Sequence, residues 1–148
     1  MNRKYLERSI IEAKKAFDHN EVPIGAVIVK NDKIIATAYN KKENDNCSIS
    51  HAEILAIKKA CKKLGNWRLD GCDIYVSLDP CPMCASAIKQ SRIQNVFSCL
   101  NNSDFNNFSI INEIFKVDRV NPEVNFKSNL CVDGSKKLLN DFFKDKRK

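Results

Sequence analysis

The sequence predicts an α/β domain, and three observations support this prediction. Short runs rich in β-branched residues alternate along the chain with segments whose apolar residues recur every three to four positions. The runs Cys72–Leu78 and Asn95–Leu100 are separated by one short helical segment, a rhythm typical of parallel strands. The length of 148 residues is that of one ordinary domain, so we expect a single domain over residues 1–148.

The amino-terminal part predicts a helix followed by a β-hairpin. Four apolar residues spaced by four, three and four positions define one face of this helix: Leu6, Ile10, Ala13 and Phe17. We expect the helix to end before Pro23. Two apolar runs, Ile24–Val29 and Ile34–Tyr39, then flank a short polar segment, which indicates two antiparallel strands.

The middle of the chain carries the clearest helix signal. Ser50 and Glu53 have the spacing of a capping box, so we expect a helix over Ser50–Leu64, with Ser50 as its N-cap and Gly65 just past its end. A polar loop precedes this helix. A second, shorter helix is expected over Pro82–Gln90, between the two parallel strands.

The carboxy-terminal part is less regular. The asparagine-rich stretch Asn101–Asn107 indicates a loop, and Phe108–Phe115 resumes an apolar pattern compatible with a short helix. Glu123–Val132 predicts a last strand, and Gly134–Lys148 predicts a closing helix that ends in basic residues.

The composition is that of a globular protein with an excess of positive charge. Hydrophobic residues make up 43% and charged residues 29% of the chain, which excludes disordered, low-complexity and collagen-like proteins. The 25 Lys and Arg against 18 Asp and Glu give a net charge of +7, typical of proteins that bind phosphate backbones or acidic surfaces. A coding bias toward lysine and asparagine would give the same charge. The placement of the basic residues must therefore decide between a surface that binds nucleic acid and a charge without function.

The chain predicts no secretion signal and no membrane span. Its longest apolar run, Ile24–Val29, is far shorter than the roughly 20 residues of a membrane helix. Seven cysteines form an odd set without the dense, even spacing of a disulfide scaffold, and Cys81 and Cys84 form a Cys-x-x-Cys pair. Such a pair is typical of metal or redox chemistry in a reducing compartment, so we expect a cytoplasmic protein.

Three potential zinc ligands lie at the starts of two expected helices: His51, Cys81 and Cys84. A helix amino terminus carries partial positive charge, which favours the ionised thiolates that zinc requires. Three protein ligands leave the fourth position open to a water molecule, whose pKa zinc lowers from about 15.7 to about 7. Glu53, two residues from the histidine, is placed to move the proton of that water.

Each of these residues also has a simpler interpretation. Glu53 alone fits a helix-capping residue, and His51 alone fits an ordinary surface residue. Cys81 and Cys84 alone fit a thioredoxin-like redox pair as well as a zinc site. Together, a His-x-Glu followed about 30 residues later by Pro-Cys-x-x-Cys matches the signature of zinc-dependent deaminases. The combination therefore favours a catalytic zinc site, with one ion per subunit.

Beyond this signature, nearly the whole chain resembles the cytidine-deaminase-like superfamily, and most closely the bacterial tRNA-specific adenosine deaminases of the TadA type. The stretches that carry the resemblance are Glu21–Val29, Asn40, His51–Ile54, Asn66–Leu69, Pro80–Ala85, Ser91–Ile93 and Leu138–Phe143. The resemblance implies a three-layer α-β-α fold with a mixed five-stranded sheet, and a homodimer. It also implies hydrolytic conversion of the wobble adenosine of a tRNA anticodon loop to inosine.

The resemblance further implies roles for individual residues. Those implied to form the catalytic centre are His51, Cys81 and Cys84 as zinc ligands and Glu53 as proton shuttle. Those implied to bind the flipped-out base are Asn40, Val22 and Pro23. Those implied to contact the RNA are Lys144, Lys146 and Arg147. Phe142 is a further candidate for contact with an RNA base, although Phe142 and Phe143 fit core positions better, and adjacent helix positions would let one of them serve each purpose. An asparagine after a strand, a proline after a helix and a basic helix end each also have an ordinary structural explanation.

Two departures from the family pattern stand out. Asp79 occupies the position before the Pro-Cys motif where the family usually has Glu, and Ser98–Asp104 replaces a glycine-rich segment that lines the substrate in the family. Two other functions stay open. One is a deaminase of free guanine or cytosine, and the other is a noncatalytic zinc or redox protein that binds RNA, in which Glu53 only caps a helix.

Overall fold

Five strands form one mixed sheet in the computed structural model, which describes residues 1–101, 108–117 and 123–146. The strands are β1 (Gly25–Lys30), β2 (Lys33–Tyr39), β3 (Cys72–Leu78), β4 (Asn95–Leu100) and β5 (Asn125–Lys127). Their order across the sheet is β2-β1-β3-β4-β5. β1 pairs antiparallel with β2 and with β3, whereas β3 pairs parallel with β4 and β4 with β5. The predicted hairpin, the predicted parallel pair and the mixed five-stranded sheet are confirmed.

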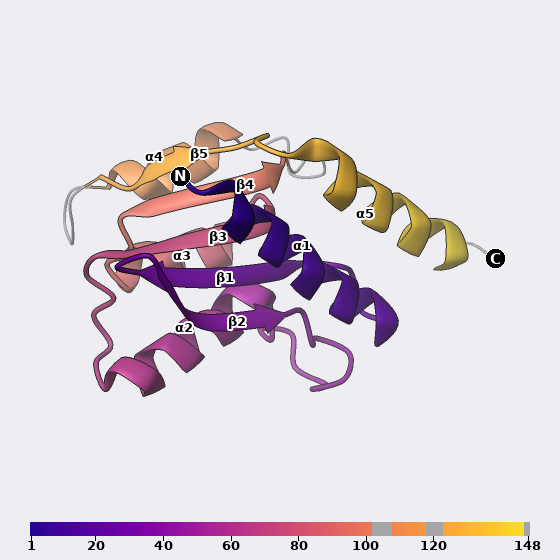
Figure 1. The fold of residues 1–148 in the computed structure, drawn as a ribbon, viewed down its shortest axis with the longest axis horizontal. Coiled ribbons are helices and arrows are strands. Elements are labelled where there is room, and N and C mark those ends of the chain that lie inside the picture. Colours follow the sequence, from indigo (N-terminus) through magenta and orange to yellow (C-terminus); the bar gives the residue numbers. More distant parts are fainter. Residues whose placement is uncertain (102–107, 118–122, 147–148) are drawn as a thin grey trace.

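Helices cover both faces of the sheet (Figure 1). They are α1 (Arg3–Asp18), α2 (Ala52–Leu64), α3 (Pro82–Gln90), α4 (Phe108–Lys116) and α5 (Val132–Lys146). α1 and α5 contact each other on one face, whereas α2, α3 and α4 pack on the other. This arrangement confirms the three-layer α-β-α fold. Among the described residues, no helix is long and apolar enough to cross a membrane.

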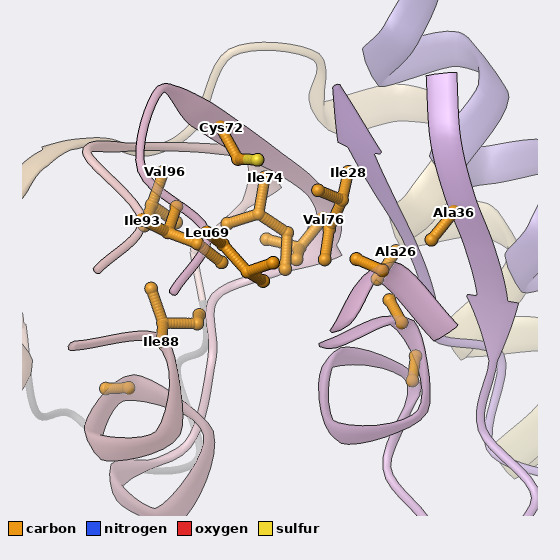
Figure 2. Close-up of a cluster of buried hydrophobic side chains, with 14 of the residues drawn as sticks. Ala26, Ile28, Ala36, Leu69, Cys72, Ile74, Val76, Ile88, Ile93 and Val96 are labelled. Atoms are coloured by element: carbon orange, nitrogen blue, oxygen red, sulfur yellow. The ribbon is translucent and has the colours of Figure 1, made fainter. Parts of the chain in front are cut away.

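The strand β1 shows how the sequence builds the three layers. Ala26 and Ile28 belong to the apolar cluster shared with α2 and α3, whereas Val27 and Val29 belong to the cluster shared with α1. Figure 2 shows Ala26 and Ile28 among the side chains of the first cluster, next to Val76 of β3. Because both of its faces are buried, β1 is a continuous apolar run and shows no alternation of polar and apolar residues.

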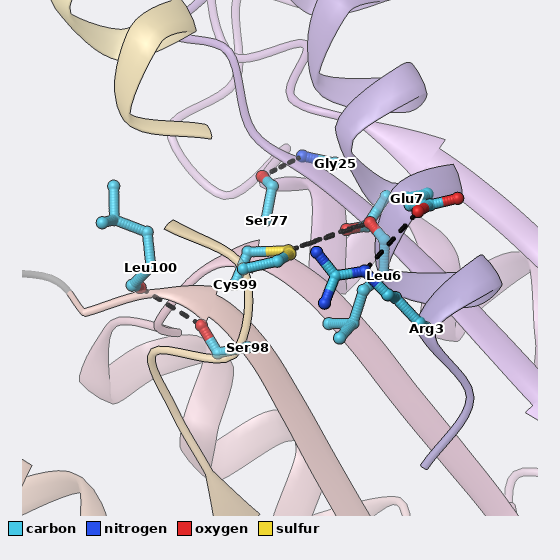
Figure 3. Close-up of a disulfide and its surroundings, with 10 residues drawn as sticks. Arg3, Leu6, Glu7, Gly25, Ser77, Ser98, Cys99 and Leu100 are labelled. Atoms are coloured by element: carbon cyan, nitrogen blue, oxygen red, sulfur yellow. Dashed lines mark hydrogen bonds and ion pairs between the residues drawn. A yellow bond between two sulfur atoms is a disulfide. The ribbon is translucent and has the colours of Figure 1, made fainter. Parts of the chain in front are cut away.

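At the start of β1, α1 approaches the strand so closely that only glycine fits. A Cβ added at Gly25 would lie 2.6 Å from the backbone nitrogen of Ala13 and 2.7 Å from the Cβ of Glu12. The Gly25 N–H also donates to Ser77 Oγ at 3.0 Å, a bond that links β1 to β3 (Figure 3). A larger residue at this position would push α1 away from the sheet.

The start of α2 differs from the prediction. The helix begins at Ala52 and its N-cap is His51, with no side-chain cap hydrogen bond, so the predicted capping box of Ser50 and Glu53 was wrong. Ser50 belongs to the preceding loop, where its backbone oxygen accepts from the Lys41 N–H at 3.0 Å. This loop contact sets the position at which the helix begins. The Glu53 side chain, which makes no capping box with Ser50, points inward and is 4% exposed.

The carboxy-terminal elements are confirmed in kind but not in length. β5 covers only three residues of the predicted strand Glu123–Val132, because the chain leaves the sheet and pairs again with β4 at two residues just before α5. α5 begins two residues before its predicted start at Gly134. The helix predicted over Phe108–Phe115 is confirmed as α4. Most of the predicted loop over residues 101–107 and the last two residues of the chain lie outside the described residues.

A disulfide between Cys99 and Cys131 joins β4 to the residue before α5 (Figure 3). Their Cα atoms lie 4.4 Å apart, and 32 residues separate them in the sequence. The cysteine pattern does not indicate this pair, because an odd set without dense spacing is not that of a disulfide scaffold. The other five cysteines are free. The disulfide therefore connects the start of α5 to the sheet.

Candidate metal centre and active site

Two helix starts bring the candidate metal ligands together. His51 is the N-cap of α2 and Cys81 is the N-cap of α3, and both have extended backbones, with φ/ψ of −74°/152° and −72°/170°. Pro82 follows Cys81 directly, where its fixed φ favours the first turn of a helix. Cys84 lies in that first turn. Because α2 and α3 pack against each other, their amino-terminal residues meet.

The three ligand atoms have the spacing that a tetrahedral zinc ion requires. His51 Nδ1 lies 3.7 Å from Cys81 Sγ and 3.5 Å from Cys84 Sγ, and all three atoms lie within 4.8 Å of one another. Zn–S bonds of about 2.3 Å and a Zn–N bond of about 2.0 Å at tetrahedral angles place nitrogen and sulfur about 3.5 Å apart. The structure thus brings the predicted ligand set together, with donor atoms and spacing that fit zinc.

Hydrogen bonds within the ligand set distribute its protons unequally. The hydrogen bond from Cys84 and, after it, the hydrogen bond with His51 together lower the pKa of the Cys81 thiol to about 4, against the opposing effect of burial. The same hydrogen bond raises the pKa of the Cys84 thiol, and burial adds to this effect. Two adjacent thiolates need a cation between them, so binding of a divalent ion would displace the Cys84 proton.

Glu53 lies in the first turn of α2, buried beside the ligands. Burial raises the pKa of its carboxyl group to about 7. The charge of Cys81 and a hydrogen bond with Cys84 both act on this carboxyl group, which places it against the ligand set. A carboxyl group with a pKa near neutrality can accept and donate a proton in one reaction cycle.

Asn40 and Val22, both predicted to bind the base, are in direct contact. Asn40 follows β2 and is 6% exposed. Its Nδ2 donates to the Val22 carbonyl at 3.2 Å, and its Oδ1 accepts from the Lys42 N–H at 3.1 Å. An amide nitrogen has a second hydrogen and an amide oxygen a second lone pair, so Asn40 can offer one donor and one acceptor to a ligand. Pro23 is fully buried next to Val22.

The residues predicted to contact RNA are only partly described. Phe142 is 7% exposed and packs edge-on against an aromatic residue of α1 and against Phe143. Lys144 is exposed, whereas the side chain of Lys146 and all of Arg147 lie outside the described residues. The aromatic side chain exposed on this part of α5 is that of Phe143, at 42%.

The structure shows contacts of residues at both departures from the family pattern, Asp79 and the segment Ser98–Asp104. Asp79 is buried and accepts a hydrogen bond from the Ser128 hydroxyl, so the shorter carboxylate contacts the segment after β5. The segment Ser98–Asp104 is described as far as Asn101. Within it, Ser98 Oγ donates to the carbonyl oxygen of Leu100 at 3.2 Å (Figure 3).

The structure adds Glu21 to the residues around Val22 and Asn40. This glutamate directly precedes Val22, is 1% exposed, and accepts backbone hydrogen bonds from Glu43 and Asn44. Its partners lie 22 and 23 residues away along the chain. A local pattern in one sequence cannot indicate such contacts, and the family resemblance, which includes Glu21, implies no role for this residue.

Comparisons with known proteins identify the family of this chain. Residues 1–147 match a family model described as MafB19-like deaminase. The chain is 42% identical over 145 residues to a tRNA-specific adenosine deaminase of Bacillus subtilis (strain 168). That alignment covers 97% of this chain and 89% of the relative.

Solved structures extend the comparison to the fold. A structure from a study of A-to-I editing by tRNA:A34 deaminases at the wobble position matches with a TM-score of 0.84 and 33% identity, covering 93% of this chain and 100% of that chain. A guanine deaminase from Bacillus subtilis matches with a TM-score of 0.68 and 41% identity, covering 72% and 69%. The first likeness includes nearly the whole chain, whereas the second leaves more than a quarter of it unmatched.

Proposed function

This chain belongs to the MafB19-like deaminase family, and from this premise we propose that it converts the wobble adenosine of a tRNA anticodon loop to inosine. The observation that carries the proposal is the meeting of His51, Cys81 and Cys84, with Glu53 buried beside them. In this reaction water replaces the amino group at C6 of the base, and ammonia leaves. Likeness to tRNA-specific adenosine deaminases over nearly the full length supports tRNA as the substrate.

We expect one zinc ion per chain, held by His51 Nδ1 and by the sulfur atoms of Cys81 and Cys84. When bound, zinc supplies an activated water molecule near neutral pH. The protein contributes the rigid placement of the ligands, because two of them are the N-caps of helices that pack against each other. The amino termini of these helices also stabilise the negative charge of the thiolates.

Glu53 carries the proton during the reaction. Its carboxylate accepts a proton from the attacking water as the oxygen approaches C6, and then delivers that proton to the departing amino nitrogen. The carboxyl group therefore ends the cycle in the state in which it began. Its exposure of 4% keeps bulk water from exchanging with the transferred proton.

Asn40 and Val22 orient the flipped-out base. The second N–H and second lone pair of the Asn40 amide can pair with a purine edge, which presents both a donor and an acceptor. Val22 supplies an apolar contact beside this amide. Pro23 is buried and acts on the base indirectly, because its fixed φ holds the backbone that presents Val22.

The basic carboxy-terminal segment of the chain binds the RNA backbone. Single-stranded RNA is held largely by phosphate contacts and by stacking of unpaired bases. Lys144, Lys146 and Arg147 supply positive charge for the phosphates within a chain of net charge +7. Phe142, buried against α1, fixes the turn of α5 from which Phe143 reaches the surface.

The active unit is a homodimer, as the resemblance implies. Two exposed apolar side chains next to the ligands support such an interface: Ile49 is 47% exposed and Met83 is 36% exposed. Apolar side chains exposed at one place are suited to contact a second subunit or the bases next to the substrate. Because transfer RNA is the substrate, the enzyme acts in the cytoplasm.

The test supplies zinc-loaded protein with an anticodon stem-loop that bears a wobble adenosine. Parallel reactions contain free adenosine, adenine, guanine or cytosine, and a matched stem-loop carries guanosine at the wobble position. Only the adenosine stem-loop should be deaminated efficiently, because contacts with phosphates and neighbouring bases position the reacting base. Rapid turnover of guanine or cytosine without turnover of the stem-loop would replace the proposal with a free-base deaminase.

A further inference from the structure

Glu21 is a buried carboxylate outside the set of residues described as catalytic. It lies between α1 and β1 and is 1% exposed. Its Oε1 accepts from the Glu43 N–H at 2.9 Å, and its Oε2 accepts from the Asn44 N–H at 2.7 Å and from Asn44 Nδ2 at 2.6 Å. Three donors from one short loop segment therefore converge on a single side chain.

These donors keep Glu21 ionised. Burial alone would raise the pKa of its carboxyl group, but the N–H groups of Asn44 and Glu43 outweigh burial and hold the pKa below its ordinary value. Within the described residues no lysine or arginine forms an ion pair with Glu21. The negative charge of Glu21 is therefore balanced by N–H groups, whose hydrogen bonds are directional. These bonds fix the position of the backbone at Glu43 and Asn44.

The segment fixed in this way joins two parts of the candidate site. It belongs to the loop that begins after Asn40 and ends at Ser50, the residue before the candidate ligand His51. A hydrogen bond of 3.0 Å from the Lys41 N–H to the Ser50 carbonyl closes this loop. Glu21 itself directly precedes Val22, whose carbonyl receives the Asn40 amide.

We propose that Glu21 is a positioning residue for the deamination reaction, acting by clamping the loop of residues 41–50 against the segment that presents Val22. This inference rests on the proposed function and deepens it. With the clamp in place, the Asn40 amide and the backbone leading to His51 hold fixed positions relative to each other. Loss of the clamp displaces the base relative to the reacting water, while the cysteine ligands on α3 keep their places.

The experiment compares Glu21→Gln and Glu21→Ala with the wild type. A matched control is Glu12→Gln, because Glu12 is also a buried glutamate, at 2% exposure, but lies on α1 and pairs with Lys15. A displacement of about 1 Å at a reacting group costs on the order of 100-fold in rate. We expect kcat on the stem-loop to fall about 10- to 100-fold in the Glu21 variants, with Glu21→Ala the more impaired.

Three further readouts separate positioning from loss of fold. In the Glu21 variants, KM for the stem-loop should change less than about threefold, because phosphate contacts outside the pocket dominate binding. The zinc content should remain that of the wild type. Amide hydrogen exchange should accelerate at Glu43 and Asn44, whereas Glu12→Gln should leave exchange at both amides and kcat unchanged.

Each outcome decides the proposal. Wild-type kcat in both Glu21 variants, or a loss of activity that only parallels loss of zinc or of folded protein, overturns the positioning role. Unchanged amide exchange at Glu43 and Asn44 overturns the clamp whatever the activity. Absence of stem-loop turnover by the wild type itself would refute the proposed function, and amide exchange across residues 41–50 would still decide whether Glu21 orders this loop.

Discussion

Cys84 Sγ lies 3.5 Å from His51 Nδ1, although 33 residues separate the two along the chain. The contact depends on two helices, since His51 precedes α2 and Cys84 lies in the first turn of α3. One helical turn advances the chain by about 5.4 Å, so sliding either helix by one turn would separate these atoms beyond the reach of one ion. The packing of α2 and α3 on the sheet therefore sets the geometry of the candidate metal centre.

Replacing Cys84 with alanine should remove the metal. We expect about one zinc per chain in the wild type and close to none in Cys84→Ala, because two remaining protein ligands bind zinc far more weakly than three. Metal analysis of purified protein by mass spectrometry measures this ratio. Cys61→Ala is the matched control, since Cys61 is a free cysteine on α2 outside the ligand set. Equal zinc in the two variants would refute the site.

Replacing Glu53 with glutamine should abolish turnover but not folding. A proton shuttle contributes about 100- to 10,000-fold to the rate, so kcat should fall by at least that range while zinc is retained. The α2 N-cap makes no side-chain hydrogen bond, and a glutamine oxygen can accept from the backbone N–H of residue 53 as the carboxylate does. A buried amide also costs less to desolvate than a buried carboxylate, so unfolding in urea should show unchanged or slightly higher stability. Comparable kcat in the variant would exclude Glu53 from the mechanism.

The sequence was sufficient to predict that the three candidate metal ligands meet, because its signals are local. Each ligand lies at the start of a helix, and Pro82 marks one of these starts within the motif itself. The capping-box prediction failed at the same place, because Ser50 and Glu53 have a spacing that fits two different structures. Loop contacts of the Ser50 backbone select the one in which His51 becomes the N-cap and Glu53 turns inward.

Other features depend on contacts that no local pattern encodes. The donors to Glu21 come from 22 and 23 residues away, and the partner of Cys99 comes from 32 residues away. With seven cysteines in the chain, their spacing alone does not identify which one pairs with Cys99. The length of the last strand was overestimated for a similar reason, because the length of β5 depends on where the chain leaves β4 and not on its own apolar content.

The ionised Glu21 should make the protein less stable at acid pH. Its pKa in the folded protein lies below the ordinary value of 4.5, although burial and the nearby Asp45 oppose this shift. A carboxyl group with a depressed pKa contributes its full stability above its unfolded pKa, and this contribution is lost as the pH falls through the folded pKa. Urea unfolding between about pH 6 and pH 2 should therefore show a shallower loss of stability in Glu21→Gln than in the wild type. Parallel curves for the two proteins would contradict this prediction.

In the oxidised, purified protein the Cys99–Cys131 disulfide should stabilise the fold by constraining the unfolded chain, whereas a reducing cytoplasm would favour the two thiols. The bond closes a loop of 32 residues, for which chain entropy gives roughly 3–4 kcal/mol. Reduction with a non-chelating phosphine, or the substitution Cys131→Ser, should lower the free energy of unfolding by about this amount. Cys47→Ser is the control, since Cys47 is free and its substitution should leave the sensitivity to reductant intact. A wild type whose urea midpoint does not respond to reductant would show that the bond does not contribute.

The basic carboxy-terminal segment should determine how strongly RNA binding depends on salt. Three basic residues are assigned to phosphates: Lys144, Lys146 and Arg147. Each phosphate contact to single-stranded RNA contributes about 0.7 to the slope of log affinity against log salt, so replacing all three with glutamine should flatten the slope by about two units. The kcat at saturating RNA should be retained, because the metal ligands and Glu53 lie on other helices.

A matched triple variant distinguishes local contacts from overall charge. Three exposed lysines on α2 can be neutralised in the same way: Lys58, Lys62 and Lys63. If the net charge of +7 alone attracts the RNA, both triple variants should weaken binding and flatten the slope equally. If α5 meets the phosphates, the α2 variant should keep the wild-type slope while the α5 variant loses about two units. Filter-binding or fluorescence titrations at several salt concentrations measure both slopes, and equal slopes in the wild type and the α5 variant would make the tail an ordinary solvated helix end.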